Sequence, residues 1–270
     1  MKLRLVATDL DGTLVRNDFT IGARSLAALE RVQALGGAVV LVTGRPIRWL
    51  HTVYEYLPIQ PLAVVANGAA VYDPVADSIL QATPLSPDAI AEACGRLRAA
   101  VPGVRFAVET DGGRVMLHEP EYEIGGWEVT GSSGVRCVDP VEITAQPAVK
   151  LLVNAGRQPA DAFTSLVADV LDGVAEATHS SSSGIVEVSA VGVTKAAGLA
   201  WVADRFGVAP HEVVAFGDMP NDLPMFAWAG RGVAMANAHP SVLAAADHVT
   251  GGNDADGVAA FLENLLNGAL

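Results

Sequence analysis

The chain has 270 residues, 51% of them hydrophobic, which is enough for one large or two modest domains with a real core and argues against disorder. Its formal net charge of -13 disfavours nonspecific binding to nucleic acid or to anionic lipid. No apolar stretch could span a membrane, and residues 1–8 reach Asp9 too early for a secretory signal, so we expect a soluble, cytoplasmic protein.

The first part of the chain alternates short apolar runs with segments of helical periodicity. The apolar runs at residues 3–8, 38–42 and 62–66 are typical of buried strands. Helices are predicted over residues 23–35 and from Pro46, which suits a first helical turn, to about residue 56. Three strands joined through helices predict a parallel sheet with right-handed crossovers.

The pattern changes after residue 70. Residues 71–72 and 78–80 predict a small hairpin, and Ser86 is expected to cap a helix that runs to about residue 100. Between residues 104 and 189, short strand-like segments are broken by glycine and proline. The clearest elements there are strands at 150–154, 174–177 and 185–189 and a helix at 159–171. We therefore expect an inserted α+β domain over residues 83–188, both ends of which join the first domain.

The alternation of strands and helices returns in the last third of the chain. The predicted elements there are strands at 212–216 and 232–235 and helices at 194–206, 223–228, 239–246 and 256–266. The expected fold class is therefore α/β, with a parallel-sheet domain built from residues 1–82 and 189–270.

Polar and charged side chains gather where these strands end or these helices begin. Because the carboxyl ends of parallel strands meet at one edge of a sheet, such residues are expected to form a single site. The residues concerned are Asp9, Asp11, Thr43, Gly44, Arg45, Lys195, Asp218, Asn221 and Asp222.

The residue types at that edge suit phosphate chemistry. Clustered carboxylates can hold Mg2+, a hard cation that prefers oxygen ligands, and one carboxylate can attack phosphorus. The Thr43 hydroxyl and free N–H groups at a helix start suit a phosphate oxygen. Four carboxylates would repel one another strongly, which a divalent cation together with Lys195 would relieve. Each motif alone could be a turn, a cap or a surface charge, but their joint order favours function.

Other residues have simpler interpretations. Cys94 and Cys137 lack the spacing of a metal site and are expected to be buried thiols. The tryptophans are expected to pack in the core or in the inserted domain; they are Trp49, Trp127, Trp201 and Trp228.

The motifs and their order resemble the signatures of the haloacid dehalogenase-like (HAD) hydrolases. The inserted domain resembles the C2B cap of the Cof-type (HAD-IIB) sugar phosphatases, and residues 66–69, 233–238 and 250–258 match as well. This resemblance covers essentially the whole core, but in the cap it is only architectural. It implies a Rossmann-like core and a Mg2+-dependent phosphatase of small phosphorylated metabolites, with sugar phosphates as the expected class.

The resemblance also implies catalytic roles. Asp9 would be the nucleophile that forms an aspartyl-phosphate, and Asp11 would protonate the leaving oxygen and later activate water. Mg2+ would be held by Asp9, by the backbone carbonyl of Asp11 and by Asp218, with Asp222 behind them through water. The presence of Asp11 favours a phosphatase over a dehalogenase, because expelling an alkoxide needs a general acid and displacing a halide does not.

The resemblance places the phosphoryl oxygens on Thr43, Gly44 and Lys195, with Asn221 positioning Lys195 or the phosphate. Specificity is expected in the cap, which would close over the site and exclude water. Candidate contacts to the leaving group, each with a structural interpretation still open, are Arg45, Lys150, Glu187 and residues 179–183, among them His179.

Three other interpretations stay open. A phosphotransferase such as a phosphomannomutase would pass the phosphoryl group to a second hydroxyl. A committed trehalose- or sucrose-phosphate phosphatase would show one sharp substrate preference. A noncatalytic binding protein could use the same core, although the intact acids and Lys195 argue against it. The sequence specifies neither the substrate nor the oligomeric state.

Overall fold

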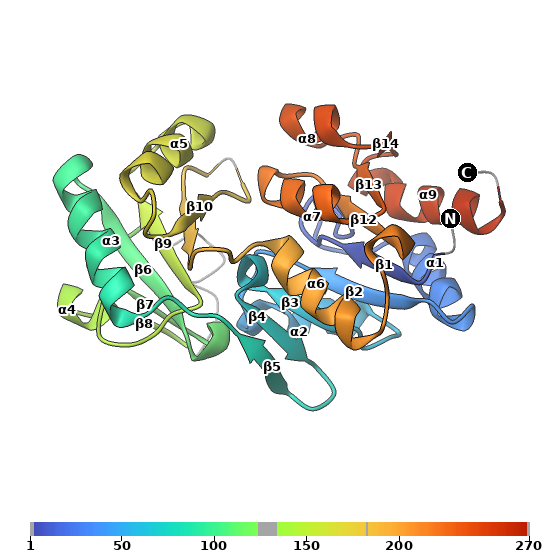
Figure 1. Cartoon of the computed structure of the whole chain (residues 1–270), viewed down its shortest axis with the longest axis horizontal. Helices are drawn as coiled ribbons and strands as arrows, with labels where there is room; N and C mark the ends of the chain where they lie inside the picture. Colours follow the sequence, from blue (N-terminus) through green and yellow to red (C-terminus); the bar gives the residue numbers. More distant parts are fainter. Residues whose placement is uncertain (1–2, 124–133, 182, 269–270) are drawn as a thin grey trace. The chain divides into compact units, whose positions relative to one another are not determined.

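Residues 3–123, 134–181 and 183–268 are described by this computed structural model, and they form two units, each built around its own sheet (Figure 1). The first unit comprises Met1–Gly44, His51–Leu80 and Thr194–Leu270, and the second comprises Arg45–Leu50 and Gln81–Val193. The chain therefore crosses between units after residues 44, 50, 80 and 193.

Among the described residues, the first unit contains an eight-stranded sheet in the order β14-β13-β12-β1-β2-β3-β4-β5. Its strands are β1 (Leu5–Thr8), β2 (Ala38–Val42), β3 (Leu62–Val65), β4 (Ala70–Asp73), β5 (Ser78–Ala82), β12 (Val213–Gly217), β13 (Arg231–Ala234) and β14 (His248–Val249). Strand β1 lies between β12 and β2, is parallel to both, and is buried along its whole length. Such a central parallel strand needs apolar side chains on both faces, which explains its continuous apolar run.

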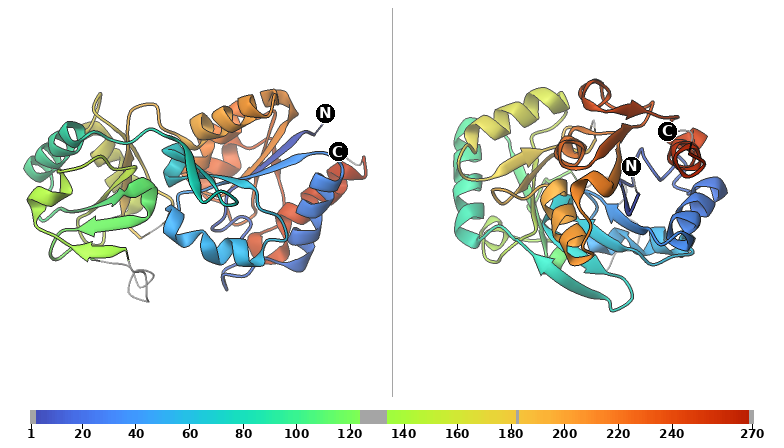
Figure 2. Two further views of the ribbon diagram at one scale, coloured as in Figure 1. Left: turned by 90° about the horizontal axis from the view of Figure 1, so that it is seen from below. Right: turned by 45° about the vertical axis from the view of Figure 1, so that its right-hand side comes forward.

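Helices cover both faces of this sheet. They are α1 (Ala23–Ala34), α2 (His51–Tyr56), α6 (Lys195–Arg205), α7 (Leu223–Trp228), α8 (Pro240–Ala245) and α9 (Gly257–Leu266). Leu199 of α6 and Met225 of α7 share a buried cluster with Leu5 of β1. On the other face, Phe261 of α9 packs edge-on against Phe216 of β12, with 5.6 Å between ring centroids. Helices α1 and α9 lie side by side (Figure 2). The predicted α/β fold with a parallel-sheet core is confirmed.

The second unit contains, within its described part, a six-stranded sheet in the order β10-β11-β9-β6-β7-β8. Its strands are β6 (Arg105–Thr110), β7 (Val115–His118), β8 (Val135–Cys137), β9 (Lys150–Asn154), β10 (Glu176–Thr178) and β11 (Val186–Ser189). Its helices are α3 (Pro87–Ala100), α4 (Pro140–Ile143) and α5 (Ala160–Val170).

The two faces of this second sheet differ in chemistry. Leu97 of α3 and Val167 of α5 join the buried cluster that contains Val108 of β6 and other inward-facing strand residues. Because successive strand residues point to opposite faces, the residues alternating with these, such as Glu109 and Lys150, lie on the face away from that cluster. One face is thus an apolar core and the other carries buried charge.

The segment after Thr43 and Gly44 differs from the sequence prediction. A single helix was expected from Pro46 to about residue 56, but a 3-10 turn, η1 (Ile47–Trp49), precedes α2. Within the turn, Arg48 forms an ion pair with Glu109 of β6, with 2.9 Å between its Nη2 and Oε1 of Glu109. Residues 45–50 belong to the second unit, as Glu109 does.

Several local predictions can be compared directly with the structure. Ser86 caps α3, since its hydroxyl accepts a hydrogen bond from the N–H of Ala89 at 3.1 Å, as predicted. The prediction that both thiols are buried is wrong for Cys137, which is exposed on β8, an edge strand. Cys94 is buried, and burial raises the pKa of its thiol to about 12.

Trp201 and Trp228 pack against the core of the first unit, as expected, whereas Trp127 lies outside the described residues. Strand β14 was not predicted, because two residues are too few to show a period. In the described part of the chain, no helix combines the length and apolarity needed to cross a membrane.

Gly68 offers a test of how tightly this framework is packed. Its φ is +105°, and a Cβ there would lie 2.0 Å from the carbonyl oxygen of Thr194, just before α6. We expect Gly68→Ala to destabilise the protein by about 1–3 kcal/mol more than Gly36→Ala, measured by urea denaturation. Gly36 is the matched control, because its φ is +82° with nothing within 4 Å of the added Cβ. Equal losses of stability in the two variants would contradict the close approach of Gly68 to the carbonyl of Thr194.

Candidate active site

The first element of the site is the loop that follows β1. The N–H of Asp9 donates to the carbonyl of Phe216 at 3.0 Å, which ties Asp9 to the neighbouring end of β12. Gly12 follows with a φ of +76°, and a Cβ there would lie 2.3 Å from Oδ2 of Asp218. Only glycine leaves room for Asp218 at this point, which explains the glycine in the motif.

The second element is the turn after β12. Oδ2 of Asp222 accepts hydrogen bonds from the N–H groups of Asp218 at 2.9 Å and of Met219 at 3.0 Å. Pro220 begins the 3-10 turn Pro220–Asp222, where its missing N–H costs nothing. The hydroxyl of Thr13 donates to Oδ1 of Asp218 at 3.0 Å. The turn therefore fixes both acids against the first loop.

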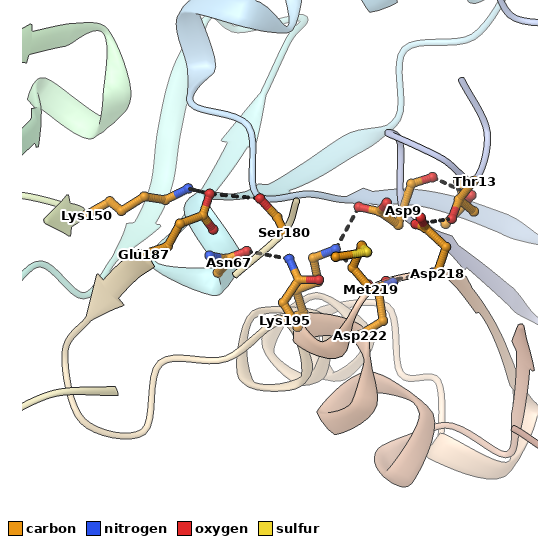
Figure 3. Close-up of polar contacts among 12 residues, drawn as sticks. Asp9, Thr13, Asn67, Lys150, Ser180, Glu187, Lys195, Asp218, Met219 and Asp222 are labelled. Carbon is orange, nitrogen blue, oxygen red and sulfur yellow. Dashed lines mark hydrogen bonds and ion pairs between the residues drawn. The ribbon is translucent and has the colours of Figure 1, made fainter. Parts of the chain in front are cut away.

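Lys195 joins these acids from the start of α6. The hydroxyl of Thr194 caps the helix by accepting from the N–H of Ala197 at 3.1 Å. Nζ of Lys195 then lies 2.6 Å from Oδ1 of Asp9 and 2.6 Å from Oδ1 of Asp222 (Figure 3). The side chain of Lys195 is 1% exposed, so both ion pairs are shielded from water.

Burial and repulsion shape the titration of these groups. Burial raises the pKa of Asp9 well above its usual range, against the attraction of Lys195. Burial and the charge of Asp222 raise the pKa of Asp218 to about 7. Burial alone would lower the pKa of Lys195, but the carboxylates of Asp222 and Asp9 outweigh it and raise that pKa. When Asp9, Asp218 and Asp222 are all ionised, their negative charge exceeds the one positive charge of Lys195, which is why burial and repulsion favour protonated acids.

The carboxylates fit a divalent cation. One oxygen from each of Asp9, Asp218 and Asp222 lies within 4.8 Å of the others. Both oxygens of Asp222 accept hydrogen bonds, whereas no donor in the described part of the chain contacts Oδ2 of Asp9 or of Asp218. Two carboxylate oxygens on largely buried residues and a deficit of positive charge match the preference of Mg2+ for oxygen ligands.

The amide and hydroxyl groups of the site come together at the end of β2 and β3. Thr43 is buried there, and its carbonyl accepts from the N–H of Asn67 at 3.1 Å. Nδ2 of Asn221 donates to Oδ1 of Asn67 at 3.0 Å. Asp11 is exposed, yet its charge contributes to the raised pKa values of both Asp9 and Asp218.

The remaining candidates lie in the second unit. Nζ of Lys150 is 3.3 Å from Oε1 of Glu187, which also accepts from the hydroxyl of Ser180 at 2.9 Å. Nδ1 of His179 lies 3.1 Å from the hydroxyl of Thr164. Arg45 reaches the carbonyl of Trp49 at 3.5 Å. The structure thus pairs Lys150 with Glu187, places His179 beside Thr164 and places Arg45 beside the carbonyl of Trp49.

Several residues whose hydrogen bonds fix the loops of the site were not predicted from the sequence. Thr13 was overlooked although it directly follows the Asp-x-Asp-Gly motif. Asn237 donates to the carbonyl of Gly12 at 2.8 Å, and Asn253 donates to that of Val15 at 3.1 Å. Both asparagines lie in segments whose resemblance to the family was noted without a role. Because they act on backbone carbonyls more than 220 residues away, no local pattern could reveal them.

Comparisons with known proteins agree with this geometry. A family model described as haloacid dehalogenase-like hydrolase matches residues 6–262. The chain is 30% identical over 260 residues to the 5-amino-6-(5-phospho-D-ribitylamino)uracil phosphatase YitU of Bacillus subtilis (strain 168), covering 96% of each. It is 27% identical to the pyridoxal phosphate phosphatase YbhA of Escherichia coli (strain K12), covering 97% of this chain and 98% of YbhA. The solved structure of the HAD subclass IIB sugar phosphatase BT4131 matches with a TM-score of 0.81 at 22% identity, covering 97% of this chain and 98% of that one.

The buried ion pairs of Lys195 predict a large effect on stability. Lys195→Met leaves two buried carboxylates without their cation, so we expect a loss of about 3–5 kcal/mol in urea denaturation without added metal. The loss should be larger at pH 8 than at pH 5, since a raised carboxyl pKa costs stability as pH rises and the acid ionises. Arg24→Met, which breaks an exposed ion pair with Glu263, should leave stability nearly unchanged. A small loss of stability in Lys195→Met that does not depend on pH would contradict the buried ion pairs of Lys195 with Asp9 and Asp222.

Proposed function

We propose a mechanism on the premise that this chain belongs to the haloacid dehalogenase-like hydrolase family, in its Cof-type subclass IIB, and is a phosphoric monoester hydrolase. The observation that carries the mechanism is the Asp9–Lys195–Asp222 contact at the carboxyl edge of the first sheet. It leaves Oδ2 of Asp9 as the oxygen that is not engaged by Lys195.

Asp9 is the proposed nucleophile. Its carboxylate oxygen attacks phosphorus, the bond between phosphorus and the leaving oxygen breaks, and an aspartyl-phosphate forms. Asp11, two residues on and exposed, gives its proton to the leaving oxygen as that bond breaks. A water molecule then attacks the phosphoryl group while Asp11 takes its proton, which releases phosphate and restores the carboxylate of Asp9.

Mg2+ is the proposed cofactor, held by Asp9, the Asp11 carbonyl and Asp218, with Asp222 behind them. When bound, it offsets negative charge on the phosphoryl group and on the acids. Lys195, Thr43 and Gly44 hold the phosphoryl oxygens, and Asn221 supports that arrangement. The backbone N–H groups at a chain turn and a buried ammonium suit an anion that the overall charge of the protein would repel.

The proposed substrates are small phosphorylated metabolites, with sugar phosphates as the first class to test. One relative is named for a phosphoribitylamino-uracil substrate and another for pyridoxal phosphate. Membership of the family therefore does not identify the leaving group of the substrate. We propose that the second unit is a C2B-type cap whose polar side chains contact the leaving group. Lys150 and Glu187 are the best supported, because their ion pair lies on the sheet face opposite the apolar cluster. Arg45 and His179 remain further candidates.

Phosphate release from a panel of phosphorylated metabolites tests the proposal. We expect turnover with Mg2+, none with EDTA, and a fall of at least 1000-fold in kcat for Asp9→Asn, roughly the size of effect expected on removing a nucleophile. Asp88→Asn, an exposed acid in α3, is the control and should retain wild-type rates. A wild type that isomerises substrates with little phosphate release would favour the phosphotransferase, and one that binds esters without turnover would favour a binding protein.

Metal binding can be tested apart from turnover. Mg2+ at about 100 times its dissociation constant should stabilise the wild type by about 2.7 kcal/mol, seen as a rise in melting temperature. Asp218→Asn should lose that rise and melt higher than wild type in EDTA at pH 7.5, since a carboxyl whose pKa is raised to about 7 costs stability once ionised. Asp88→Asn should respond to Mg2+ like wild type. A preserved Mg2+ response in Asp218→Asn would remove Asp218 from the metal site.

A further inference from the structure

The turn between β3 and β4 has an unusual backbone. Ala66, Asn67 and Gly68 have φ values of 49°, 59° and 105°, so three consecutive residues lie in the left-handed region. Two of them carry a Cβ, which makes this conformation costly by about 1–3 kcal/mol for each. Asp111, Gly112 and Gly113 form a similar run, but only one of those residues is not glycine. Backbone strain of this kind persists where surrounding contacts require it.

This turn contacts three segments that carry the proposed chemistry, those of Thr43, Lys195 and Asn221. The N–H of Asn67 donates to the carbonyl of Thr43 at 3.1 Å. Gly68 approaches the carbonyl of Thr194 so closely that no Cβ fits between them, and Thr194 directly precedes Lys195. Oδ1 of Asn67 accepts from Nδ2 of Asn221 at 3.0 Å. One strained turn thus joins the segments that supply Thr43, Lys195 and Asn221.

The hydrogen bonding of Asn221 is incomplete. The residue is 5% exposed, and its amide nitrogen donates to Asn67. Its Oδ1 is buried and has no hydrogen-bond partner in the described part of the chain. Buried amide oxygens are normally paired, so one without a donor calls for an explanation. The contact with Asn67 uses one of the two N–H groups of the Asn221 amide, so the second N–H can donate to a phosphoryl oxygen, which an amide oxygen cannot do.

We propose that Asn67 is a positioning residue for phosphate binding, which acts by holding the Asn221 amide in one orientation beside Lys195. The inference rests on the proposed phosphatase function and adds to it Asn67, a residue that has no role in the mechanism proposed above. The left-handed backbone is what brings the Asn67 side chain to Asn221 while its N–H stays on Thr43. Asparagine suits both tasks, because it tolerates this conformation better than other residues with an acceptor.

The test separates the side chain from the backbone. Asn67→Gly removes the acceptor for Asn221 but adopts a positive φ without strain, so the relief of backbone strain should offset much of the cost of leaving the buried Asn221 amide without that acceptor. We expect inorganic phosphate, titrated in the presence of Mg2+, to bind about tenfold more weakly to Asn67→Gly, the size of a lost hydrogen bond in a charged site. Asp77→Gly is the matched control: Asp77 has a φ of 44° in the exposed turn between β4 and β5, and phosphate affinity should not change.

A double-mutant cycle with Asn221→Ala tests whether Asn67 acts through Asn221. If it does, Asn67→Gly should cause no further loss of phosphate affinity in the Asn221→Ala background, whereas independent effects would add. If Asn67→Gly binds phosphate as tightly as wild type, or if the losses of phosphate affinity in the cycle are additive, the inference about Asn67 is wrong. Neither result would contradict the proposed phosphatase function. A wild type that neither binds phosphate nor releases it from any ester would overturn the proposed function, and the inference with it.

Discussion

The ammonium of Lys195, held between the carboxylates of Asp9 and Asp222, is the interaction on which the site depends. It joins the end of β1, the end of β12 and the start of α6, which are distant in the sequence. Burying three charged groups costs desolvation energy, and an apolar substitute of the same volume could be as stable. The benefit is geometric, because the ammonium holds two carboxylates together that would otherwise repel and move apart.

The same balance bears on the proposed binding of a phosphate ester by this acidic protein. With a net charge of -13, the overall field opposes the approach of a phosphate ester. The proposed site would attract the ester at short range through one buried ammonium, a cation held by the carboxylates, and N–H groups at turns. Interactions at such distances in a buried site are much less screened than those across the surface. The local arrangement can therefore prevail over the global charge.

The acids and Lys195 could be predicted from the sequence because topology alone brings them together. Strands β1, β2 and β12 are parallel neighbours, so whatever follows them meets at one edge. The contacts of Thr13, Asn67, Asn237 and Asn253 could not be predicted, since each depends on the conformation of a loop and not on strand order. The pairing of Arg48 with Glu109 escaped prediction for a related reason: helical periodicity after Pro46 said nothing about a partner 61 residues away.

Residues 45–50 group with the second unit, and this has a consequence for recombining domains among relatives. A chimera that exchanged only residues 81–193 would separate Arg48 from its ion-pair partner on β6, Glu109, which is only 2% exposed. A buried carboxylate without its cation is strongly destabilising. The unit that could be exchanged is therefore discontinuous in the sequence. It includes the six residues directly after Thr43 and Gly44 as well as the larger insertion. Exchanging the second unit among relatives would then require chain junctions directly after Thr43 and Gly44.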